Sequence, residues 1–398
     1  MRLNDLRPTC NSFMYLERYL NDGSPSGFSI INTPTPGFRA LDSINSFEIP
    51  IFDCSEFDAV SVGNSHTLAA KLLPVHPDMT DAFEAIVGKT SFRKLKAMPT
   101  SSGRTLLVFS DNGSFYAKVA YQGLLGRVTR RMTKAHVLSA IEVSSVYESA
   151  IAAGKMPRSF HIYREHCGLH FLDSGPLENW GYVERAIAPY PEGNHIEIPA
   201  FSLIAKNIEG KHLFRDLLEV SPSLCTIDGF FTLIIQPLLD LYFSSLITLG
   251  LQPECHAQNV VFLLDCKYIP IGVALRDMES VDKDLPLIEE RNLDKEFTPT
   301  QYKFLSRKSY NYQIMHSFMY DFKLGEYLIG PLVDAWAKLN GISQLKNIEQ
   351  QIRIYAREKL LLLPNDFFPE DCWYDYEAVV HEGSSTRNYR RNPSPRFR

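Results

Sequence analysis

A short polar block, Glu254-Cys255-His256-Ala257-Gln258-Asn259, follows a long apolar segment and Gly250. Alternate residues of an extended strand point to the same side, so we expect Glu254, His256 and Gln258 to share a face. Asn259 and, across the hairpin that follows, Asp277 carry oxygen atoms of the kind that bind Mg²⁺. Polar side chains that emerge from an apolar helix need internal partners or a ligand. The block therefore predicts a ligand site, and a network of satisfied hydrogen bonds is the alternative.

Charge is distributed unevenly along the chain. Residues 89–134 contain ten basic residues and one acid, whereas residues 277–296 contain eight acids and three bases. A segment charged so differently from its host usually has an anion to meet. A multiply charged phosphate needs basic groups on its oxygens and carboxylates that hold Mg²⁺. The two segments therefore predict a phosphate site, and two solvated faces that pair with each other are the alternative.

Residues of the type that bind transition metals also gather in one stretch: His161, His166, Cys167 and His170. Their spacing matches no standard zinc pattern. Histidines on a strand are more often core or surface residues than ligands. We therefore interpret this group as structural.

The polar block and its neighbours resemble the IucA/IucC family, the NRPS-independent siderophore synthetases. Residues 250–262, GLQPECHAQNVVF, resemble the family's E-x-H-x-Q-N block, which also follows an apolar helix that ends in a glycine. Further blocks occur in the family's order: residues 73–77 for its PvHPWQ segment, 99–105 for its P-t-x-S-x-R-T motif, Lys118 for its lysine, Arg130 for its arginine and Arg276-Asp277 for its RD. The resemblance spans residues 60–380, and the combination of blocks in the correct order is fairly specific.

The resemblance implies an α+β fold shaped like a cupped hand, with β-rich fingers, a mostly helical, kinase-like palm and a thumb that is reduced here. It implies an ATP-dependent ligase of siderophore-type biosynthesis. Such an enzyme adenylates a carboxylic acid, citrate or similar, releases pyrophosphate and condenses the acyl group with an amine or a hydroxyl. The implied cofactors are ATP and Mg²⁺, and the implied partners are small-molecule carboxylates, amines and alcohols. Many members of the family are dimers, which makes a homodimer an expectation, although the residues leave the oligomeric state open.

The resemblance also assigns roles to residues of this chain. The catalytic residues would be His256, Arg104, Lys118 and Arg130. The nucleotide would be bound by Ser102, Arg104, Lys118, Arg130, Gln258, Asn259 and Asp277. The acid would be bound by Arg104, Arg130, Glu254 and His256. The Mg²⁺ ligands would be Asn259, Asp277 and Glu279. Arginine suits such a role because its guanidinium grips a carboxylate with two parallel hydrogen bonds.

The sequence departs from the family pattern in three ways. The chain is shorter than most members and lacks much of the thumb region. The HPWQ segment reads His76-Pro77-Asp78-Met79, and Gly126 stands where the family usually has an acid-binding threonine. A hydroxyl lost from the acid pocket predicts a different acid or weaker acid binding.

Two other functions remain open. A phosphotransferase of the aminoglycoside-kinase sort also has a His followed by an Asn and then an Asp. However, no Asp lies within residues 256–259, and no glycine-rich loop precedes Lys118. The changes at Asp78, Met79 and Gly126 motivate the second alternative, a non-catalytic relative that binds nucleotide or a partner.

Hydrophobic patterning and turn residues predict the elements that must position these side chains. Asn112-Gly113 predicts a hairpin turn, and Gly154 the end of a helix. The expected elements are a helix at 81–89, a hairpin at 105–121, a helix at 135–153, strands within 158–190, helices from 199 to 250, a strand pair at 259–264 and 268–275, and helices within 309–363.

Length and composition set the class of protein. The 398 residues are 45% hydrophobic with a net charge of −5, which fits a globular protein and disfavours a general nucleic-acid or anionic-membrane binder. The apolar segment 230–249 is interrupted by Gln236, Pro237 and Asp240, so we predict a buried helix rather than a membrane span. The N-terminus shows no secretory signal, and seven scattered cysteines fit reduced thiols, so we expect a cytoplasmic protein.

The same patterning suggests a division of the chain into four parts. They are an irregular N-terminal segment at 1–80 (the reduced thumb), a β-rich fingers-like lobe at 81–195, a palm-like helical lobe with the HxQN hairpin at 196–380, and a disordered basic tail at 381–398.

Overall fold

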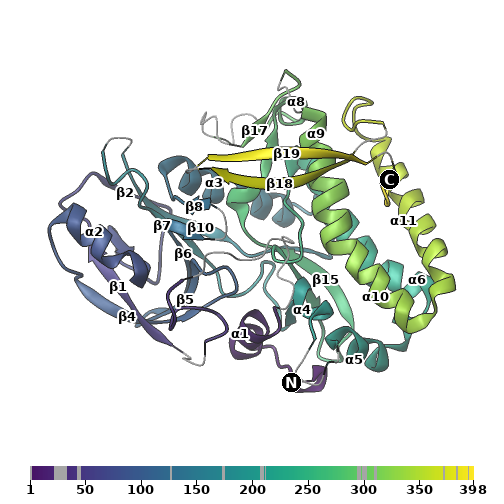
Figure 1. Cartoon of the computed structure of the whole chain (residues 1–398), viewed down its shortest axis with the longest axis horizontal. Helices are drawn as coiled ribbons and strands as arrows, with labels where there is room; N and C mark the ends of the chain where they lie inside the picture. The colour runs from purple at the N-terminus through teal and green to yellow at the C-terminus, as the bar shows by residue number, and fades with distance from the viewer. Residues whose placement is uncertain are drawn as a thin grey trace.

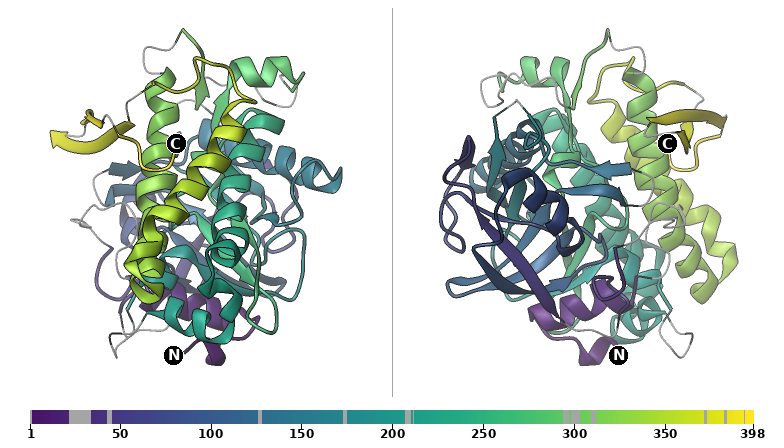
Figure 2. Two further views of the ribbon diagram at one scale, coloured as in Figure 1. Left: turned by 90° about the vertical axis from the view of Figure 1, so that its right-hand side faces the viewer. Right: turned by 60° about the vertical axis from the view of Figure 1, so that its left-hand side comes forward.

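The computed structural model describes residues 2–21, 34–42, 46–125, 128–172, 175–206, 210, 212–293, 297, 303–308, 312–370, 373–381, 384–392 and 394–398. A lobe rich in strands, built from the first half of the chain, lies beside a lobe rich in helices (Figure 1). Helix α1 (Cys10–Tyr19) lies between the two lobes at the N-terminal end of the molecule (Figures 1 and 2). The fold thus combines α and β structure in two lobes that lie side by side, with α1 between them.

The strand-rich lobe is built on one antiparallel sheet of eight strands. In their order across the sheet the strands are β2 (Ala59–Val62), β10 (Glu165–Phe171), β11 (Tyr182–Arg185), β6 (Gly113–Val119), β5 (Thr105–Ser110), β4 (Arg93–Pro99), β1 (Phe47–Asp53) and β3 (Leu72–Pro74). Strands β5 and β6 form the predicted hairpin, with Ser110 opposite Gly113 at the turn. Because Thr105 pairs with Lys118 in this register, Lys118 and Arg104, the residue before β5, lie at the same end of the sheet.

Two helices and a small hairpin accompany this sheet. Helix α2 (Thr80–Val87) ends at Gly88, and α3 (Lys134–Ala152) packs on β10 and continues to β9 in the second lobe. Both helices were predicted from the sequence. The hairpin joins β7 (Tyr121–Leu125) to β8 (Val128–Arg130) and carries Arg130 at its end.

The second lobe contains a four-stranded sheet and a three-stranded sheet. The first has the order β12 (Ile196–Pro199), β14 (Val260–Leu264), β15 (Pro270–Leu275) and β9 (Phe160–Ile162). The second has the order β13 (Leu251–Gln252), β16 (Asp282–Asp284) and β17 (Phe304–Leu305). The pair β14–β15 is the predicted hairpin, and it ends directly before Asp277.

Helices cover the remainder of this lobe. They are α4 (Ala200–Ile204), α5 (Leu213–Val220), α6 (Ile227–Phe230), α7 (Gln236–Leu249), α8 (Leu285–Glu290), α9 (Tyr312–Ser317), α10 (Gly330–Asn340) and α11 (Leu345–Leu360). The π-helical segments Phe231–Ile235 and Phe318–Ile329 join α6 to α7 and α9 to α10. Short 3-10 turns occupy Leu3–Asp5, Pro77–Met79, Pro222–Cys225, Met278–Ser280 and Ile342–Gln344.

The apolar run predicted as a buried helix is the run from α6 through α7. Among the described residues, the run Ile227–Leu249 is the one helical run that is long and apolar enough to cross a membrane. However, 67% of its most apolar stretch is buried inside the protein. It ends at Gly250, whose φ of 65° is left-handed, and a Cβ there would meet the Ile288 nitrogen at 2.8 Å. Glycine therefore fits both the turn and the close approach.

Three clusters of buried side chains hold the molecule together. One lies within the strand-rich lobe and a larger one within the helical lobe, where Trp336 is fully buried and its Nε1–H donates to the Leu224 carbonyl at 2.7 Å. The third joins the lobes. In it Phe13 of α1 packs with Tyr116 of β6 and Tyr163 after β9. The site described below lies beside this third cluster.

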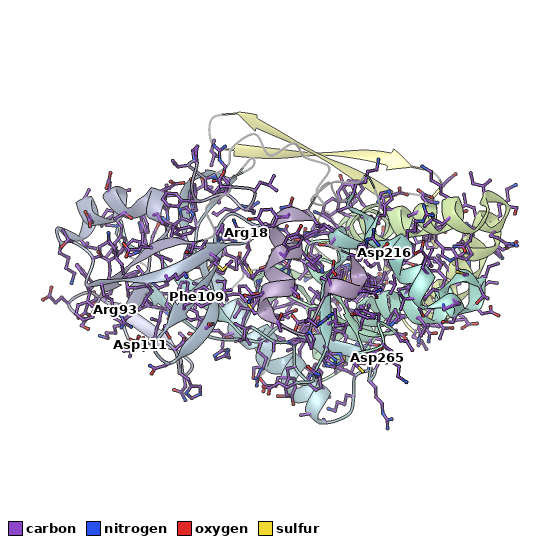
Figure 3. All side chains as sticks on the ribbon, turned by 90° about the horizontal axis from the view of Figure 1, so that it is seen from below. Arg18, Arg93, Phe109, Asp111, Asp216 and Asp265 are labelled. Atoms are coloured by element: carbon purple, nitrogen blue, oxygen red, sulfur yellow. The ribbon has the colours of Figure 1, made fainter. Side chains whose placement is uncertain are left out.

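Helix α1 is anchored from several directions. Arg18 is buried, and its guanidinium donates to the carbonyls of Ala40 and Asp42 at 3.0 and 2.9 Å. Figure 3 places Arg18 between the strand-rich lobe, marked by Arg93 and Asp111, and the helical lobe, marked by Asp216. The helix is therefore part of the folded body rather than a surface strap.

The structure corrects two expectations about the ends of the chain. The segment 1–80, expected to be irregular, contains α1 and the sheet strands β1, β2 and β3. The expected disordered tail contains β19 (Ser384–Asn392), which pairs with β18 (Trp373–His381) in a hairpin that projects from the body (Figure 2). Beyond it Phe397 is buried, and Arg398 Nε bonds to Asp321 at 2.9 Å. The tail was expected to be disordered because it is basic, and the acidic partners of its arginines lie far away in the sequence. The domain boundaries themselves stay predictions.

Candidate active site

A cleft opens where the end of the large sheet faces the β14–β15 hairpin and α1. The empty space inside it, its open mouth included, is about 700 Å³. Its walls are formed by Phe13, Glu17, Thr100, Ser101, Ser102, Arg104, Thr105, Tyr116, Lys118, Arg130, Tyr163, Arg185, Gln258, Asn259, Arg276 and Asp277. Seven residues assigned from the sequence are therefore in this wall: Ser102, Arg104, Lys118, Arg130, Gln258, Asn259 and Asp277.

The turn between β4 and β5 supplies the first group of side chains. Gly103 adopts a left-handed φ of 74° in this turn. Ser102 Oγ accepts a hydrogen bond from the Thr105 backbone N–H at 2.9 Å. Through this bond the serine holds the turn that places Arg104 at the cleft.

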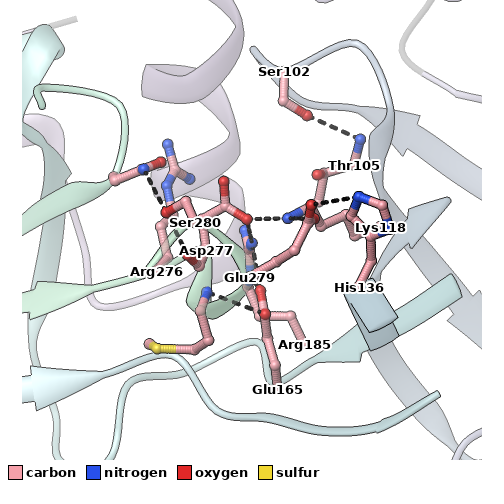
Figure 4. A network of polar contacts seen from close by, with 12 residues as sticks. Ser102, Thr105, Lys118, His136, Glu165, Arg185, Arg276, Asp277, Glu279 and Ser280 are labelled. Atoms are coloured by element: carbon pink, nitrogen blue, oxygen red, sulfur yellow. Dashed lines mark hydrogen bonds and ion pairs between the residues drawn. The ribbon is translucent and has the colours of Figure 1, made fainter. Parts of the chain in front are cut away.

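Lys118 lies at the centre of a buried ion-pair cluster (Figure 4). Its Nζ contacts Asp277 and lies 2.6 Å from Glu279 Oε2. Arg104 Nη2 reaches the same Glu279 oxygen at 3.4 Å, and His136 Nε2 lies 3.6 Å from the other. Charges from both lobes thus meet across the cleft, which joins the basic and the acidic segments noted in the sequence.

The two carboxylates are held ionised. Burial raises the pKa of Asp277, but Lys118 and Arg185 outweigh this and bring the pKa to about 2. Burial likewise raises the pKa of Glu279, but Lys118, Arg104 and His136 bring it far below its usual range. Asp277 also has a left-handed φ of 74°, a strained conformation for a residue with a Cβ. Two ionised carboxylates, one on a strained backbone, are suited to hold a cation at this position.

A second ion pair supports the first. Arg185 Nη2 lies 2.6 Å from Glu165 Oε1 and 3.7 Å from Asp277 Oδ1, and Glu165 Oε2 accepts from the Met278 N–H at 3.2 Å. Burial lowers the pKa of Arg185, but Glu165 and Asp277 raise it above its usual value. The pair therefore fixes the loop that carries Asp277.

The α1 side of the cleft holds a third ion pair. Arg276 Nη2 lies 2.7 Å from Glu17 Oε1, and the other oxygen of Glu17 accepts from Ser101 Oγ at 2.7 Å. Sequence reasoning missed Glu17, Glu165 and Arg185. Each is a single charged residue in an ordinary strand or helix pattern, and no motif or spacing distinguishes it. Only their burial, visible in the structure, identifies them.

The polar block itself differs from its expected conformation. Residues 253–259 form a turn before β14, so Glu254, His256 and Gln258 do not alternate along a strand. Gln258 and Asn259 line the cleft, whereas Glu254 and His256 are not among the lining residues. Hydrogen bonds within the block explain why the alternation fails here: the Asn259 N–H donates to the His256 carbonyl at 2.9 Å, and the Gln258 N–H donates to His256 Nδ1 at 3.2 Å.

His256 is buried and Glu254 is half-buried beside the cleft. Glu254 pairs with Lys323 Nζ at 2.9 Å and lies 3.9 Å from His256 Nε2. Burial lowers the pKa of His256 to about 4, so its imidazole is neutral at pH 7. Asn259 Nδ2 donates to the Glu254 carbonyl at 3.2 Å, which ties these residues to the cleft wall.

Arg130 lies at the mouth of the cleft on β8. Its side chain is exposed, and among the described residues no ion pair to it is present. It is therefore available to an incoming anion. Gly126, noted for the acid pocket, lies outside the described residues.

This arrangement places cationic side chains around an open cleft, with Asn259 and Asp277 in its wall; Glu279 is buried beside them and is not among the lining residues. It can neutralise a multiply charged anion and orient it against a second reactant. Asp277, Glu279 and the Asn259 amide oxygen are hard donors of the kind that Mg²⁺ prefers. In the present state Lys118 occupies the two carboxylates, so a metal ion there would take over contacts that the lysine now makes.

No known family model matches the sequence, and no curated protein matches it. Solved structures do match. The petrobactin biosynthesis protein AsbB of Bacillus anthracis aligns over 97% of this chain and 75% of its own, with a TM-score of 0.67 and 15% identity. ATP-bound aerobactin synthetase IucA of a hypervirulent Klebsiella pneumoniae aligns over 82% of this chain and 66% of its own, with a TM-score of 0.62 and 13% identity.

A third solved structure gives the same result. Aerobactin synthetase IucC of Klebsiella pneumoniae aligns over 80% of this chain and 65% of its own, with a TM-score of 0.58 and 14% identity. This chain therefore spans about two thirds of the length of each aerobactin synthetase. The resemblance predicted from the sequence is confirmed at the level of architecture: the chain has the fold of these siderophore synthetases.

Proposed function

We propose that this protein is an ATP-dependent ligase that adenylates a carboxylic acid and condenses it with an amine or a hydroxyl. The observation that carries the proposal is the cleft lined by Arg104, Lys118, Arg130 and Asp277, with Glu279 paired to Arg104 and Lys118 beside it, in a chain with the fold of siderophore synthetases. ATP use is supported by the structural neighbour IucA, which is described as ATP-bound. Citrate or a similar acid, an amine or alcohol acceptor and a siderophore-type product are the substrates and product we infer.

The proposed reaction has two steps. First, a carboxylate oxygen attacks the α-phosphorus of ATP; an acyl-adenylate forms and pyrophosphate leaves. Second, the amine or hydroxyl attacks the acyl carbon; the new amide or ester bond forms, AMP leaves with the electrons of the broken C–O bond, and the nucleophile gives up one proton. No oxidant or reductant is required.

The side chains of the cleft would have different roles in these two steps, according to their charge. Arg104, Lys118 and Arg130 would offset the negative charge of the phosphates and of the carboxylate, which otherwise repel each other. Gln258 would help to hold the nucleotide. Buried and neutral, His256 would act as a hydrogen-bond partner beside the acyl group rather than as a cation.

Mg²⁺ fits the oxygen donors in and beside the cleft wall. Asp277, Glu279 and Asn259 would hold it, and it would supply positive charge against the phosphate oxygens. Lys118 would then exchange its carboxylate partners for a phosphate. For the fold, we propose a cupped-hand arrangement with a kinase-like palm. We further propose a soluble cytoplasmic protein, with a homodimer as the expected assembly.

Acyl activation trapped with hydroxylamine tests this proposal directly. Purified protein, ATP and Mg²⁺ are offered citrate, succinate, 2-oxoglutarate and amino acids in turn, and both pyrophosphate and ADP are followed. Pyrophosphate release that depends on one acid supports the ligase and identifies its carboxylate. Absence of turnover with every acid would argue against it.

A kinase-like phosphotransferase is the second candidate. It is favoured by the pairing of a strand lysine, Lys118, with an acid that follows a β-hairpin, Asp277, an arrangement that protein kinases also use. ADP rather than pyrophosphate in the same assay would select it.

A non-catalytic relative is favoured by the position of His256 outside the cleft wall, and nucleotide binding without turnover would select that alternative.

A further inference from the structure

Three side chains with metal-binding atoms converge on the face of the large sheet opposite the cleft. The ligand atoms of His166, Cys167 and Glu184 all lie within 4.8 Å of one another. Arg185, the residue after Glu184 on β11, lines the cleft, and successive strand residues point to opposite faces. The cluster is therefore separate from the cleft.

A β-bulge brings the three side chains together. Glu165 pairs with Arg185 and Cys167 with Glu184, so His166 is an extra residue in β10. In such a bulge two successive residues oppose one residue of the neighbouring strand and can share its side of the sheet. His166 and Cys167 thus both reach Glu184, which consecutive residues of a regular strand would not. The spacing of the histidines and the cysteine in the sequence could not reveal this site, because Glu184 lies on another strand and the bulge is visible only in the structure.

The loop between β2 and β3 closes over the bulge. Gly63 has a left-handed φ of 71°, and a Cβ there would meet the His166 carbonyl oxygen at 2.1 Å, so the loop approaches closer than a side chain allows. From this loop Ser65 Oγ donates to Glu184 Oε2 at 2.7 Å. The hydroxyl holds the carboxylate in place from behind, as supporting groups do for metal ligands.

The charge on Glu184 also calls for a cation. Its side chain is 2% exposed, and His166 Nε2 lies 3.6 Å from Oε1. Among the described residues no lysine or arginine forms an ion pair with it. A buried carboxylate is costly unless it is paired, protonated or bound to a metal. His166, Ser65 and Thr67 contact this carboxylate at present, and a divalent ion would add a full positive charge to these contacts.

We propose that His166, Cys167 and Glu184 bind a divalent transition metal ion of the zinc type. Sulfur and imidazole ligands favour Zn²⁺ and similar ions over Mg²⁺ or Ca²⁺. With bonds of about 2.0–2.3 Å, tetrahedral ligand atoms lie about 3.3–3.8 Å apart. The longest present separation must therefore shorten by about 1 Å. The His166 side chain is 33% exposed, which gives the ion a path from solvent and leaves a fourth position for water.

The other two histidines of the stretch do not belong to this site. His170 Nδ1 lies 3.0 Å from the Phe171 carbonyl, and the His161 ring packs against His195. Bound metal would tie β10 to β11 next to Glu165 and Arg185, and so would stiffen the pair that supports Asp277. The site itself does not depend on the proposed ligase activity.

Cobalt titration of the full chain tests the proposal. The protein is stripped with a chelator, dialysed and titrated with Co²⁺, whose tetrahedral thiolate complexes absorb in the near ultraviolet and the visible. We expect one Co²⁺ per chain with a thiolate charge-transfer band, displaced by Zn²⁺. Cys167→Ser should abolish the band, and His166→Ala, at a half-buried position of the bulge, should weaken binding by at least ~10-fold.

Two variants of the same lobe serve as controls. Cys54→Ser alters another buried thiol, and His170→Gln another histidine of β10; both should titrate like the wild type. Absence of a thiolate band in the wild type would overturn the proposal. So would a band that persists unchanged in Cys167→Ser.

Discussion

At the scale of single residues, Arg104 is the sharpest test of the cleft. The residue is 9% exposed, and its guanidinium lies 3.4 Å from Glu279 of the other lobe. We expect Arg104→Ala to reduce acid-dependent pyrophosphate release by about 10²- to 10³-fold, because a fixed cation near developing negative charge is lost. Arg93→Ala, at the exposed Arg93–Asp111 pair of the same lobe, should leave the rate unchanged. Near-normal turnover in Arg104→Ala would contradict the assigned role.

Glu197 gives a prediction about pH. Its carboxyl accepts from Tyr163 at 2.6 Å, and burial raises its pKa to about 7 although that hydrogen bond lowers it. Because the folded chain holds this proton more tightly than the unfolded chain, the associated stability is present below the unfolded pKa and is lost as pH rises to about 7. Glu197→Gln should therefore gain stability over the wild type at pH 8 but not at pH 4.

The size of this effect follows from the pKa difference. One pKa unit corresponds to about 1.36 kcal/mol, so the gain at pH 8 is up to about 3 kcal/mol. Urea unfolding of both proteins at the two pH values measures it. If the stability difference between variant and wild type is the same at pH 4 and pH 8, Glu197 does not titrate as described.

At the scale of elements, α1 is the helix on which the cleft wall depends. Glu17 is 1% exposed, and its pairing with Arg276 crosses from α1 to the β14–β15 hairpin. Glu17→Ala should lower the free energy of unfolding by about 3 kcal/mol, because removal of one partner leaves a buried charge unpaired. Glu219→Ala, at the exposed Arg215–Glu219 pair, should change it by less than about 0.5 kcal/mol. Urea unfolding compares the two; equal losses would show that the Glu17 pair is no stronger than a surface one.

The elements also show where sequence reasoning works. The Asn-Gly turn, the Gly154 and Gly250 helix ends and the two hairpins were predictable because each depends on residues close together in the chain. The turn at 253–259 was not, since hydrogen bonds within the block override the alternation there. The strands β1 and β2 were missed because their partners β4 and β10 come later in the chain, and β3 was missed because it depends on its pairing with β1.

The same contrast applies to the candidate site. Ser102, Arg104, Lys118 and Asp277 could be named because they lie in recognisable blocks, and the structure brings them to one cleft. Glu17, Glu165 and Arg185 could not, since their partners are distant in sequence and ordinary in type. Charge balance along the chain predicted a phosphate site, with two faces that pair with each other as the alternative; it could not name the residues that pair in the structure.

At the scale of the whole molecule, the ion pairs of Lys118 couple the lobes to ligand binding. Mg²⁺–ATP bound across the cleft should stabilise the folded chain by about 2.7 kcal/mol at a concentration one hundred times its Kd. Thermal unfolding should therefore shift upward in the wild type and much less in Lys118→Met. Lys94→Met, on the exposed Lys94–Glu48 pair of the same sheet, should respond like the wild type. An undiminished shift in Lys118→Met would contradict this binding mode.

The bulge on β10 has a consequence for how this chain can change in evolution. Loss of a residue within a regular strand turns every side chain beyond it to the opposite face of the sheet. His166 is the extra residue opposite Glu184, so its loss would instead restore a regular ladder between β10 and β11. Relatives could therefore gain or discard the histidine of this cluster by a single-codon insertion or deletion, while the register that holds Glu165 against Arg185 stays intact.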